Sequence, residues 1–254
     1  MKLSPSRINT YLRCPKSYEF SYVHELKLPP AGVMVRGTAC HEAARHNFAA
    51  KVQTGQDAPI ADLLDVFSGV FDREVEGAKL RENENAGKLK DSGVKLTTIY
   101  RTERAPLIVP AVYEQRVILE LEGGDTFEGV VDLATADHKI IDLKTASKKP
   151  AANTADNSMQ LTAYGWAYYH LTNVLPTGYA LDFAIHDHEG KTDKAQARVL
   201  TLETQRTALD LDDFAEDVAG VFRAIKAGAF PRSTAGWHCS PEWCGYWELC
   251  RGRK

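Results

Sequence analysis

Three charged residues in one short stretch have the types and spacing of a catalytic site. Residues 129–145 read GVVDLATADHKIIDLKT, with Asp132 and Asp142 on two apolar runs and Lys144 two residues after the second aspartate. Side chains alternate across a strand, so Asp142 and Lys144 share one face, and Asp132 reaches it if the runs pair as a hairpin. Two carboxylates and an ammonium favour a divalent cation, which lowers the pKa of an attacking water. That chemistry hydrolyses phosphodiester bonds.

A structural explanation of the same residues also exists. Alternating charges are typical of the solvent-exposed face of an antiparallel sheet. The three residues alone leave both interpretations open, so the remainder of the chain has to decide between them.

The composition is that of an ordinary soluble globular protein of 254 residues, 44% hydrophobic and 26% charged. No apolar run is long enough to span a membrane, and the N-terminus, MKLSPSRINTYLRC, lacks the apolar region of a signal peptide. We therefore expect the cytoplasm as the site of action. The net charge of −3 disfavours a protein that coats nucleic acid but not an enzyme with a local basic groove.

The cysteines indicate a metal or cluster site. Cys239, Cys244 and Cys250 lie within the segment HCSPEWCGYWELC, and such loops usually wrap a metal or a cluster. A fourth ligand is required. Cys14 would join the two ends of the chain, whereas His238 would give a local zinc site. The fifth cysteine, in the segment TACHEA, lies apart from the others.

Two further polar features lie on predicted helices. His41 begins the segment HEAAR, which lacks the second histidine of the zinc-protease pattern because Arg45 occupies that position. Gln160 and Tyr164 are four residues apart and share a helix face. Each of these side chains is compatible with a catalytic site or with hydrogen bonding inside the core.

The hydrophobic periodicity predicts a single mixed α/β domain with a central mixed sheet flanked by helices. We expect a helical N-terminal portion at about 1–105, a core at about 106–227 and a cysteine loop at 228–254. Residues 81–93 are polar and read as an exposed loop. The predicted helices are 36–52, 60–80, a weaker one at 94–103, 157–172 and 204–227, and the predicted strands are 111–121, 126–134, 138–144, 178–187 and 195–202.

Taken in order, these segments resemble the PD-(D/E)XK nuclease superfamily. They are most similar to its RecB-like branch with a cysteine cluster, which includes the AddB nuclease domain and CRISPR adaptation exonucleases. The matching segments are SPSRINTYLRCPKSYEF, RGTACHEA, GVVDLA, IIDLKT, QLTAY and the terminal cysteine loop. The resemblance implies a restriction-endonuclease-like core over the whole of residues 1–254.

The resemblance also implies roles for individual residues. One or two Mg²⁺ or Mn²⁺ ions would be held by His41, Asp132, Asp142 and the backbone carbonyl of Leu143. Lys144 would be the catalytic lysine, and Gln160 and Tyr164 would position DNA or the lysine. Cys14, Cys239, Cys244 and Cys250 would hold a structural 4Fe–4S cluster, with Zn²⁺ as the alternative at that site.

We therefore expect a stand-alone DNA exonuclease that acts on single strands or duplex ends, with DNA contacts from Arg7, Lys148 and Lys149. Such an enzyme suits phage recombination and replication, repair or CRISPR adaptation, beside an annealing protein, a helicase or an adaptation protein. The alternatives are a DNA-binding assembly subunit with a vestigial site and an endonuclease with structural zinc. Two departures from the family pattern stand out: an aspartate at the second acidic position and four residues between the first two loop cysteines. Glu114, on the preceding strand, could support the site, although no motif requires it.

Overall fold

The computed structural model describes residues 1–82, 84–186 and 196–252, and these form two compact units. The first, which we call the terminal unit, contains Met1–Leu28, Ile118–Gly129 and Ala208–Lys254. The second, the sheet unit, contains Pro29–Val117 and Val130–Thr207. Within the described residues, no helix is both long and apolar enough to cross a membrane.

A mixed sheet carries the sheet unit. Strand β3 (Asp125–Thr135) runs antiparallel to β4 (Lys139–Ala146), β4 runs parallel to β5 (Gly178–His186), and β5 runs antiparallel to β6 (Ala197–Thr204). Strand β2 (Pro110–Leu121) pairs with β3. Every residue of β5 is buried, as expected for an inner strand covered on both faces. The predicted fold class is confirmed, while positions 187 and 195 of the predicted strands lie outside the described residues.

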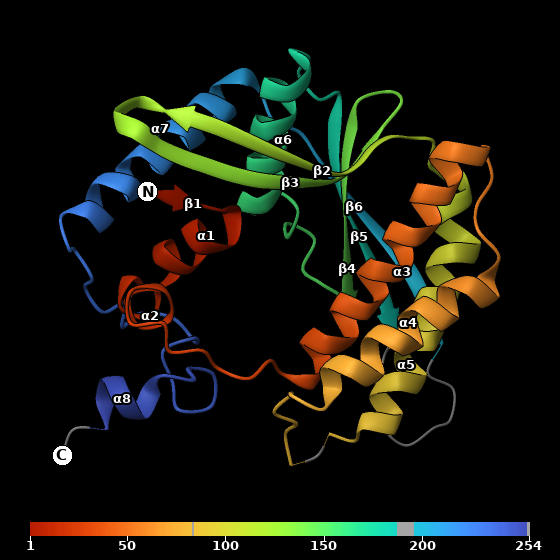
Figure 1. The fold of residues 1–254 in the computed structure, drawn as a ribbon, viewed down its shortest axis with the longest axis horizontal. Helices are drawn as coiled ribbons and strands as arrows, with labels where there is room; N and C mark the ends of the chain where they lie inside the picture. Colours follow the sequence, from red (N-terminus) through yellow and green to blue (C-terminus); the bar gives the residue numbers. More distant parts are fainter. Residues whose placement is uncertain (83, 187–195, 253–254) are drawn as a thin grey trace. The chain divides into compact units, whose positions relative to one another are not determined.

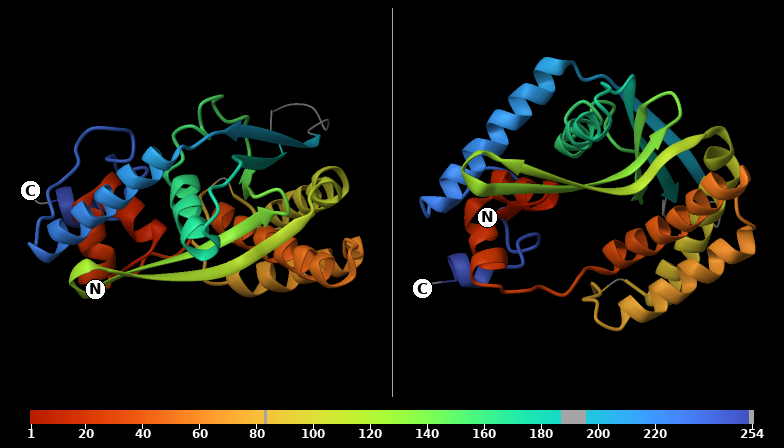
Figure 2. Two further views of the ribbon diagram at one scale, coloured as in Figure 1. Left: turned by 90° about the horizontal axis from the view of Figure 1, so that it is seen from above. Right: turned by 45° about the horizontal axis from the view of Figure 1, so that its top comes forward.

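Helices cover both faces of this sheet (Figure 1). Helices α3 (Gly32–Thr54), α4 (Ile60–Val75) and α5 (Ala86–Ile99) lie on one side, and α6 (Met159–Thr172) lies on the other, as Figure 2 also shows. Alternate residues of β4 explain the two layers: Ile141 and Leu143 enter the core formed with α3–α5, and Lys144 contacts α6. The strand is therefore apolar towards one layer and polar towards the other.

Residues 86–93 are helical, so the prediction of a loop across 81–93 was wrong for that part. Helix α5 begins at Asn85, whose side chain accepts a hydrogen bond from the backbone N–H of Lys88. Gly93 lowers the helix propensity of the segment, but a Cβ at that position would lie 2.1 Å from Cζ of Phe67. The glycine therefore permits close packing of α5 on α4 instead of marking a turn.

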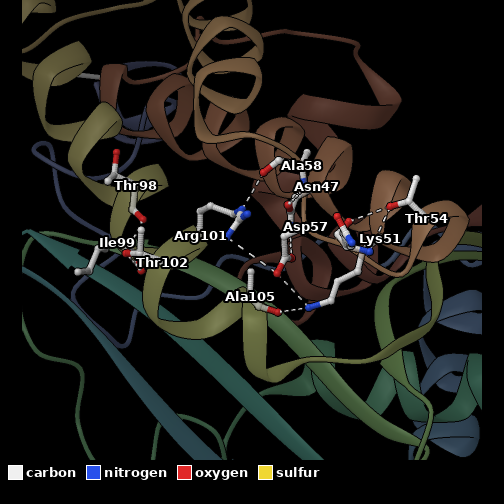
Figure 3. A network of polar contacts seen from close by, with 11 residues as sticks. Asn47, Lys51, Thr54, Asp57, Ala58, Thr98, Ile99, Arg101, Thr102 and Ala105 are labelled. Carbon is white, nitrogen blue, oxygen red and sulfur yellow. Dashed lines mark hydrogen bonds and ion pairs between the residues drawn. The ribbon is translucent and has the colours of Figure 1, made fainter.

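A polar network ties the end of α3 to the segment before β2 (Figure 3). Lys51 forms an ion pair with Asp57 at 3.2 Å and donates a hydrogen bond to the carbonyl of Ala105 at 2.6 Å. Asn47 donates to Asp57 at 2.7 Å, and Arg101, from a π-helical turn at Tyr100–Arg104, donates to the carbonyl of Ala58 at 2.9 Å. These mostly buried contacts fix α3, which carries His41, against the entry to the sheet.

The terminal unit gathers both ends of the chain. It contains β1 (Lys2–Leu3), α1 (Pro5–Arg13), α2 (Pro15–Tyr18), α7 (Ala208–Lys226), the short α8 (Trp247–Arg251) and the far ends of β2 and β3. Gly123 and Gly124 turn the β2–β3 hairpin with φ of 76° and 73°, as the sequence predicts. Asp125 binds the N-terminal ammonium at 3.1 Å and Lys226 at 2.7 Å.

Candidate active site

The two aspartates of the predicted catalytic stretch lie side by side in the sheet unit. Leu133 of β3 pairs with Ile141 of β4, and the same register continued by one residue sets Asp132 opposite Asp142. Asp142 is fully buried, and neither carboxylate oxygen accepts a hydrogen bond of good geometry from a described residue. Burial, followed by the charge of Asp142, raises the pKa of Asp132 from 3.8 to about 8. The two carboxyl groups therefore occupy a space that favours only one negative charge.

The polar side chains around this pair form a continuous ring. Lys144 Nζ lies 2.7 Å from Oδ2 of Asp142 and donates a hydrogen bond to Oε1 of Gln160 at 2.7 Å. Gln160 Nε2 donates to the hydroxyl of Tyr164 at 2.5 Å, and that hydroxyl donates to Oδ1 of Asp132 at 3.1 Å. Five residues that the sequence predicts as site residues, from two strands and one helix, are thus connected by direct contacts.

Helix α6 supplies the amide and the phenol of the ring. Its first turn is capped by Ser158, whose hydroxyl accepts from the backbone N–H of Leu161 at 3.3 Å. Gln160 and Tyr164 then follow one turn apart on the face towards β4. Burial, followed by the negative charge of Asp132, raises the pKa of Tyr164 above its ordinary value. The phenol therefore stays protonated and acts as a hydrogen-bond donor.

His41 reaches the same site from α3. Burial lowers the pKa of the imidazole, although Asp142 and a hydrogen bond with the main chain of Leu143 oppose that shift. One turn earlier, a Cβ at Gly37 would lie 3.3 Å from Oγ1 of Thr145, so the glycine allows α3 to approach β4 closely. A neutral imidazole next to a main-chain oxygen and a carboxylate is suited to share a metal ion.

Glu114 and Arg45 also border the site, and no sequence motif identified them as part of it. Both line a hollow together with His41 and Asp132. Arg45 pairs with Glu42 at 2.7 Å. Burial, followed by the charge of Glu42, raises the pKa of Glu114. The positive charge of Arg45 opposes this shift. Glu114 also has φ of +47°, a left-handed conformation that is rare for a residue inside a strand and that the sequence does not signal.

A sequence profile of the PD-(D/E)XK nuclease superfamily matches residues 2–251, nearly the entire chain. The chain belongs to this superfamily. The name of the superfamily denotes an acidic residue followed by a second acidic residue and a lysine, and residues of these types stand at positions 132, 142 and 144.

One solved structure shares the fold of this chain at low sequence identity. The chain is similar to a protein from Eubacterium rectale named as a candidate exonuclease, with a TM-score of 0.52, 12% identity, and coverage of 94% of this chain and 86% of that one. It also matches an alkaline exonuclease from Laribacter hongkongensis with a TM-score of 0.30, 15% identity, and coverage of 67% and 79%, a likeness too small to support any argument. No curated protein matches the chain.

The four cysteines predicted as ligands come together in the terminal unit. Cys14 lies between α1 and α2, Cys239 and Cys244 lie in the loop before α8, and Cys250 is in α8. Burial raises the pKa of Cys244, and the charges of the three other thiols raise it further. A main-chain hydrogen bond opposes this shift. The thiols are therefore close enough to repel one another when ionised. The alternative ligand His238 has a buried Nε2 with no hydrogen-bond partner among the described residues.

Neither predicted metal site has its ligands already in coordination geometry. Across the described ranges, no three His, Cys, Asp or Glu side chains converge on a point that would hold a metal ion. At the acidic pair the physical reason is visible, because the ammonium of Lys144 sits against Asp142 and the hydroxyl of Tyr164 against Asp132. The donor types still fit a hard divalent cation, since both oxygens of Asp142 are buried without a hydrogen bond.

The residues predicted to contact DNA belong to both units. Lys148 and Lys149 are exposed just after β4. Arg7 belongs to the terminal unit, where its guanidinium donates to the carbonyl of Lys2 at 3.2 Å and lies 4.8 Å from the ring centre of Tyr22. A role in DNA binding stays a prediction for all three basic residues.

The raised pKa of Asp132 predicts how stability depends on pH in the absence of metal. A carboxyl that holds its proton more tightly when folded stabilises the protein most below pH 3.8 and loses that contribution as the pH rises towards 8. Asp132→Asn should therefore unfold at a higher temperature than wild type at pH 8 in EDTA. We expect a gain of more than about 1 kcal/mol, which shrinks towards pH 4.

Thermal unfolding of both proteins across this pH range measures the effect. Asp137→Asn, in the exposed turn between β3 and β4, is the control and should leave the difference from wild type nearly constant with pH above 5. Parallel curves for wild type and Asp132→Asn would contradict the raised pKa.

Proposed function

We propose that this protein is a metal-dependent deoxyribonuclease that acts as a stand-alone exonuclease. The observation that carries the proposal is the ring of Asp142, Lys144, Gln160, Tyr164 and Asp132, which brings two carboxylates and a lysine to one buried point. A purely structural sheet would gain little from placing two acidic groups side by side, because a single lysine lies against the pair. Membership of a nuclease superfamily supports DNA as the substrate.

The metal ligands that we propose are His41, Asp132, Asp142 and the backbone carbonyl of Leu143, with Mg²⁺ or Mn²⁺ as the ion. A divalent cation held there would supply positive charge for the transition state and lower the pKa of the attacking water. Asp132 must lose its proton for the ion to bind, because its pKa of about 8 keeps the carboxyl mostly protonated at neutral pH without metal. His41 is already neutral, because burial lowers its pKa.

The roles of the other ring residues follow from their contacts. The ammonium of Lys144 has Gln160 on one side and Asp142 on the other, so its position is fixed within reach of a bound phosphate group. We assign it to orienting the attacking water and balancing charge on phosphate. Gln160 and Tyr164 act as positioning residues, because they connect Lys144 to Asp132 through three hydrogen bonds.

Digestion of end-labelled single- and double-stranded DNA in Mn²⁺ or Mg²⁺ tests this function. Asp142→Ala should reduce cleavage by at least about a thousandfold, and Lys144→Met by about a hundredfold or more. Asp137→Ala removes an exposed aspartate from the same stretch and should retain wild-type activity. Shortening from labelled ends into mononucleotides or short products with 5′-phosphates would support an exonuclease.

Two results would contradict the assignment. Equal cleavage by wild type and Asp142→Ala would show that the acidic pair is not the active site. DNA binding without cleavage by folded wild type in either metal would favour a DNA-binding subunit with a vestigial site.

We also propose that Cys14, Cys239, Cys244 and Cys250 hold a 4Fe–4S cluster with a structural role. Besides burial, the charges of Cys14, Cys239 and Cys250 raise the pKa of Cys244, which supports the grouping of the four thiols, and all four are free cysteines. Thiolates suit iron–sulfur or zinc, so zinc held by the three loop cysteines and His238 is the competing arrangement.

Protein purified without oxygen should be brown, absorb broadly near about 400 nm and contain iron and sulfide. Cys250→Ser should lose the colour and much of the soluble yield, because a structural metal contributes to the folding free energy. Cys40→Ser, at the fifth cysteine, is the control and should keep the absorbance, since Cys40 is buried in the sheet unit. A colourless protein with one zinc that His238→Ala removes would contradict the cluster.

A further inference from the structure

Two tryptophan rings stand out from the surface of the terminal unit. The side chains of Trp237 and Trp243 are 69% and 52% exposed, although indole is among the groups that gain most from burial. Their ring centres lie 5.2 Å apart with an interplanar angle of 87°. By contrast, Trp166 of α6 is 6% exposed. We call Trp237 and Trp243 the indole pair.

The loop that carries the indole pair is ordered by its own hydrogen bonds. Ser240 stands between the two tryptophans, and its hydroxyl donates to the carbonyl of Trp237 at 3.1 Å. The carbonyl of Ser240 accepts from the N–H groups of Trp243 at 3.3 Å and of Cys244 at 2.9 Å. The rings therefore project from a compact turn, so holding them in place for a ligand requires little further ordering.

The geometry of the pair suits flat aromatic ligands. In an edge-to-face arrangement one ring covers part of a single face of the other, and Trp237 and Trp243 remain 69% and 52% exposed. Nucleobases that are not paired in a duplex expose equivalent flat faces, and stacking on tryptophan tolerates any base. Arg232 and Arg251 are exposed in the same segment and suit the phosphates that adjoin stacked bases.

We propose that the indole pair is a binding site for unpaired nucleobases of single-stranded DNA. The proposal rests on the proposed function in one respect, namely that DNA is the substrate. The described residues from Gly228 to Gly252 contain two arginines and two glutamates, Glu242 and Glu248, so long-range attraction for phosphate is weak. Binding at this loop must therefore depend on the bases more than on the backbone charge.

The test compares two oligonucleotides of equal length, oligothymidylate and an abasic deoxyribose-phosphate strand, bound to the full-length protein in EDTA. Tryptophan fluorescence quenching and anisotropy report the affinity. Wild type should bind oligothymidylate more tightly, and Trp237→Ala and Trp243→Ala should each weaken that binding between about fivefold and about a hundredfold. Neither variant should change the affinity for the abasic strand.

Two controls separate stacking from loss of structure. Leu209→Ala removes a side chain of similar exposure, 66%, from α7 of the same unit and should bind as wild type does. Trp237→Phe keeps an aromatic face and should retain most of the affinity that Trp237→Ala loses. Unchanged binding in both alanine variants, or equal affinity of wild type for the two strands, would overturn the proposal. So would a change in oligomeric state without a change in DNA affinity, because the pair would then be a protein interface.

Failure of this inference and failure of the proposed function give different results. Cleavage that depends on Asp142, together with oligothymidylate binding that ignores Trp237, would leave a nuclease without this binding site. Binding that depends on Trp237 in a protein that cleaves no DNA would keep the base-binding site and remove the nuclease assignment.

Discussion

The close approach of Asp132 and Asp142 is the interaction on which the remaining features of the site depend. Burial, followed by the charge of the neighbouring Asp142, raises the pKa of Asp132 to about 8. Such an arrangement destabilises the protein unless a positive charge or a proton is present. The polar groups around the pair reduce this cost. The ammonium of Lys144 lies against Asp142, and the hydroxyl of Tyr164 donates a hydrogen bond to Asp132.

A small number of strands and helices position the acidic pair and the residues around it. The register of β3 on β4 sets the two aspartates opposite each other. Helix α6 brings the amide and the phenol from one face of the sheet, and α3 brings His41 from the helical layer on the other. Gly37 allows α3 to come close to β4. Lys144 supplies the positive charge beside the pair.

Contacts that depend on short sequence spacing could be predicted, and contacts between distant elements could not. The two-residue period of a strand aligns Asp142 with Lys144, and the four-residue spacing of a helix aligns Gln160 with Tyr164. Arg45 was not predicted, and Glu114 was named only as a residue that could support the site, because only the tertiary fold brings β2 to α3.

At two further places, helix α5 and the four cysteines, the short-range sequence pattern could not give what the structure shows, for similar physical reasons. The start of α5 was read as a loop because Gly93 lowers helix propensity, whereas the glycine serves packing against Phe67. The grouping of the four cysteines was expected from a resemblance to a family, and spacing alone could not place Cys14 beside a loop more than two hundred residues away.

Calorimetric titration of the metal-free protein with Mn²⁺ at pH 7 tests the central claim most directly. Titrations in buffers of different ionisation enthalpy count the protons that metal binding releases. Because Asp132 carries a proton when Asp142 is its neighbour, wild type should release about one proton per bound ion, and Asp132→Asn should bind more weakly and release none. Metal binding to wild type without proton release, or equal release by Asp132→Asn, would contradict the account of the acidic pair.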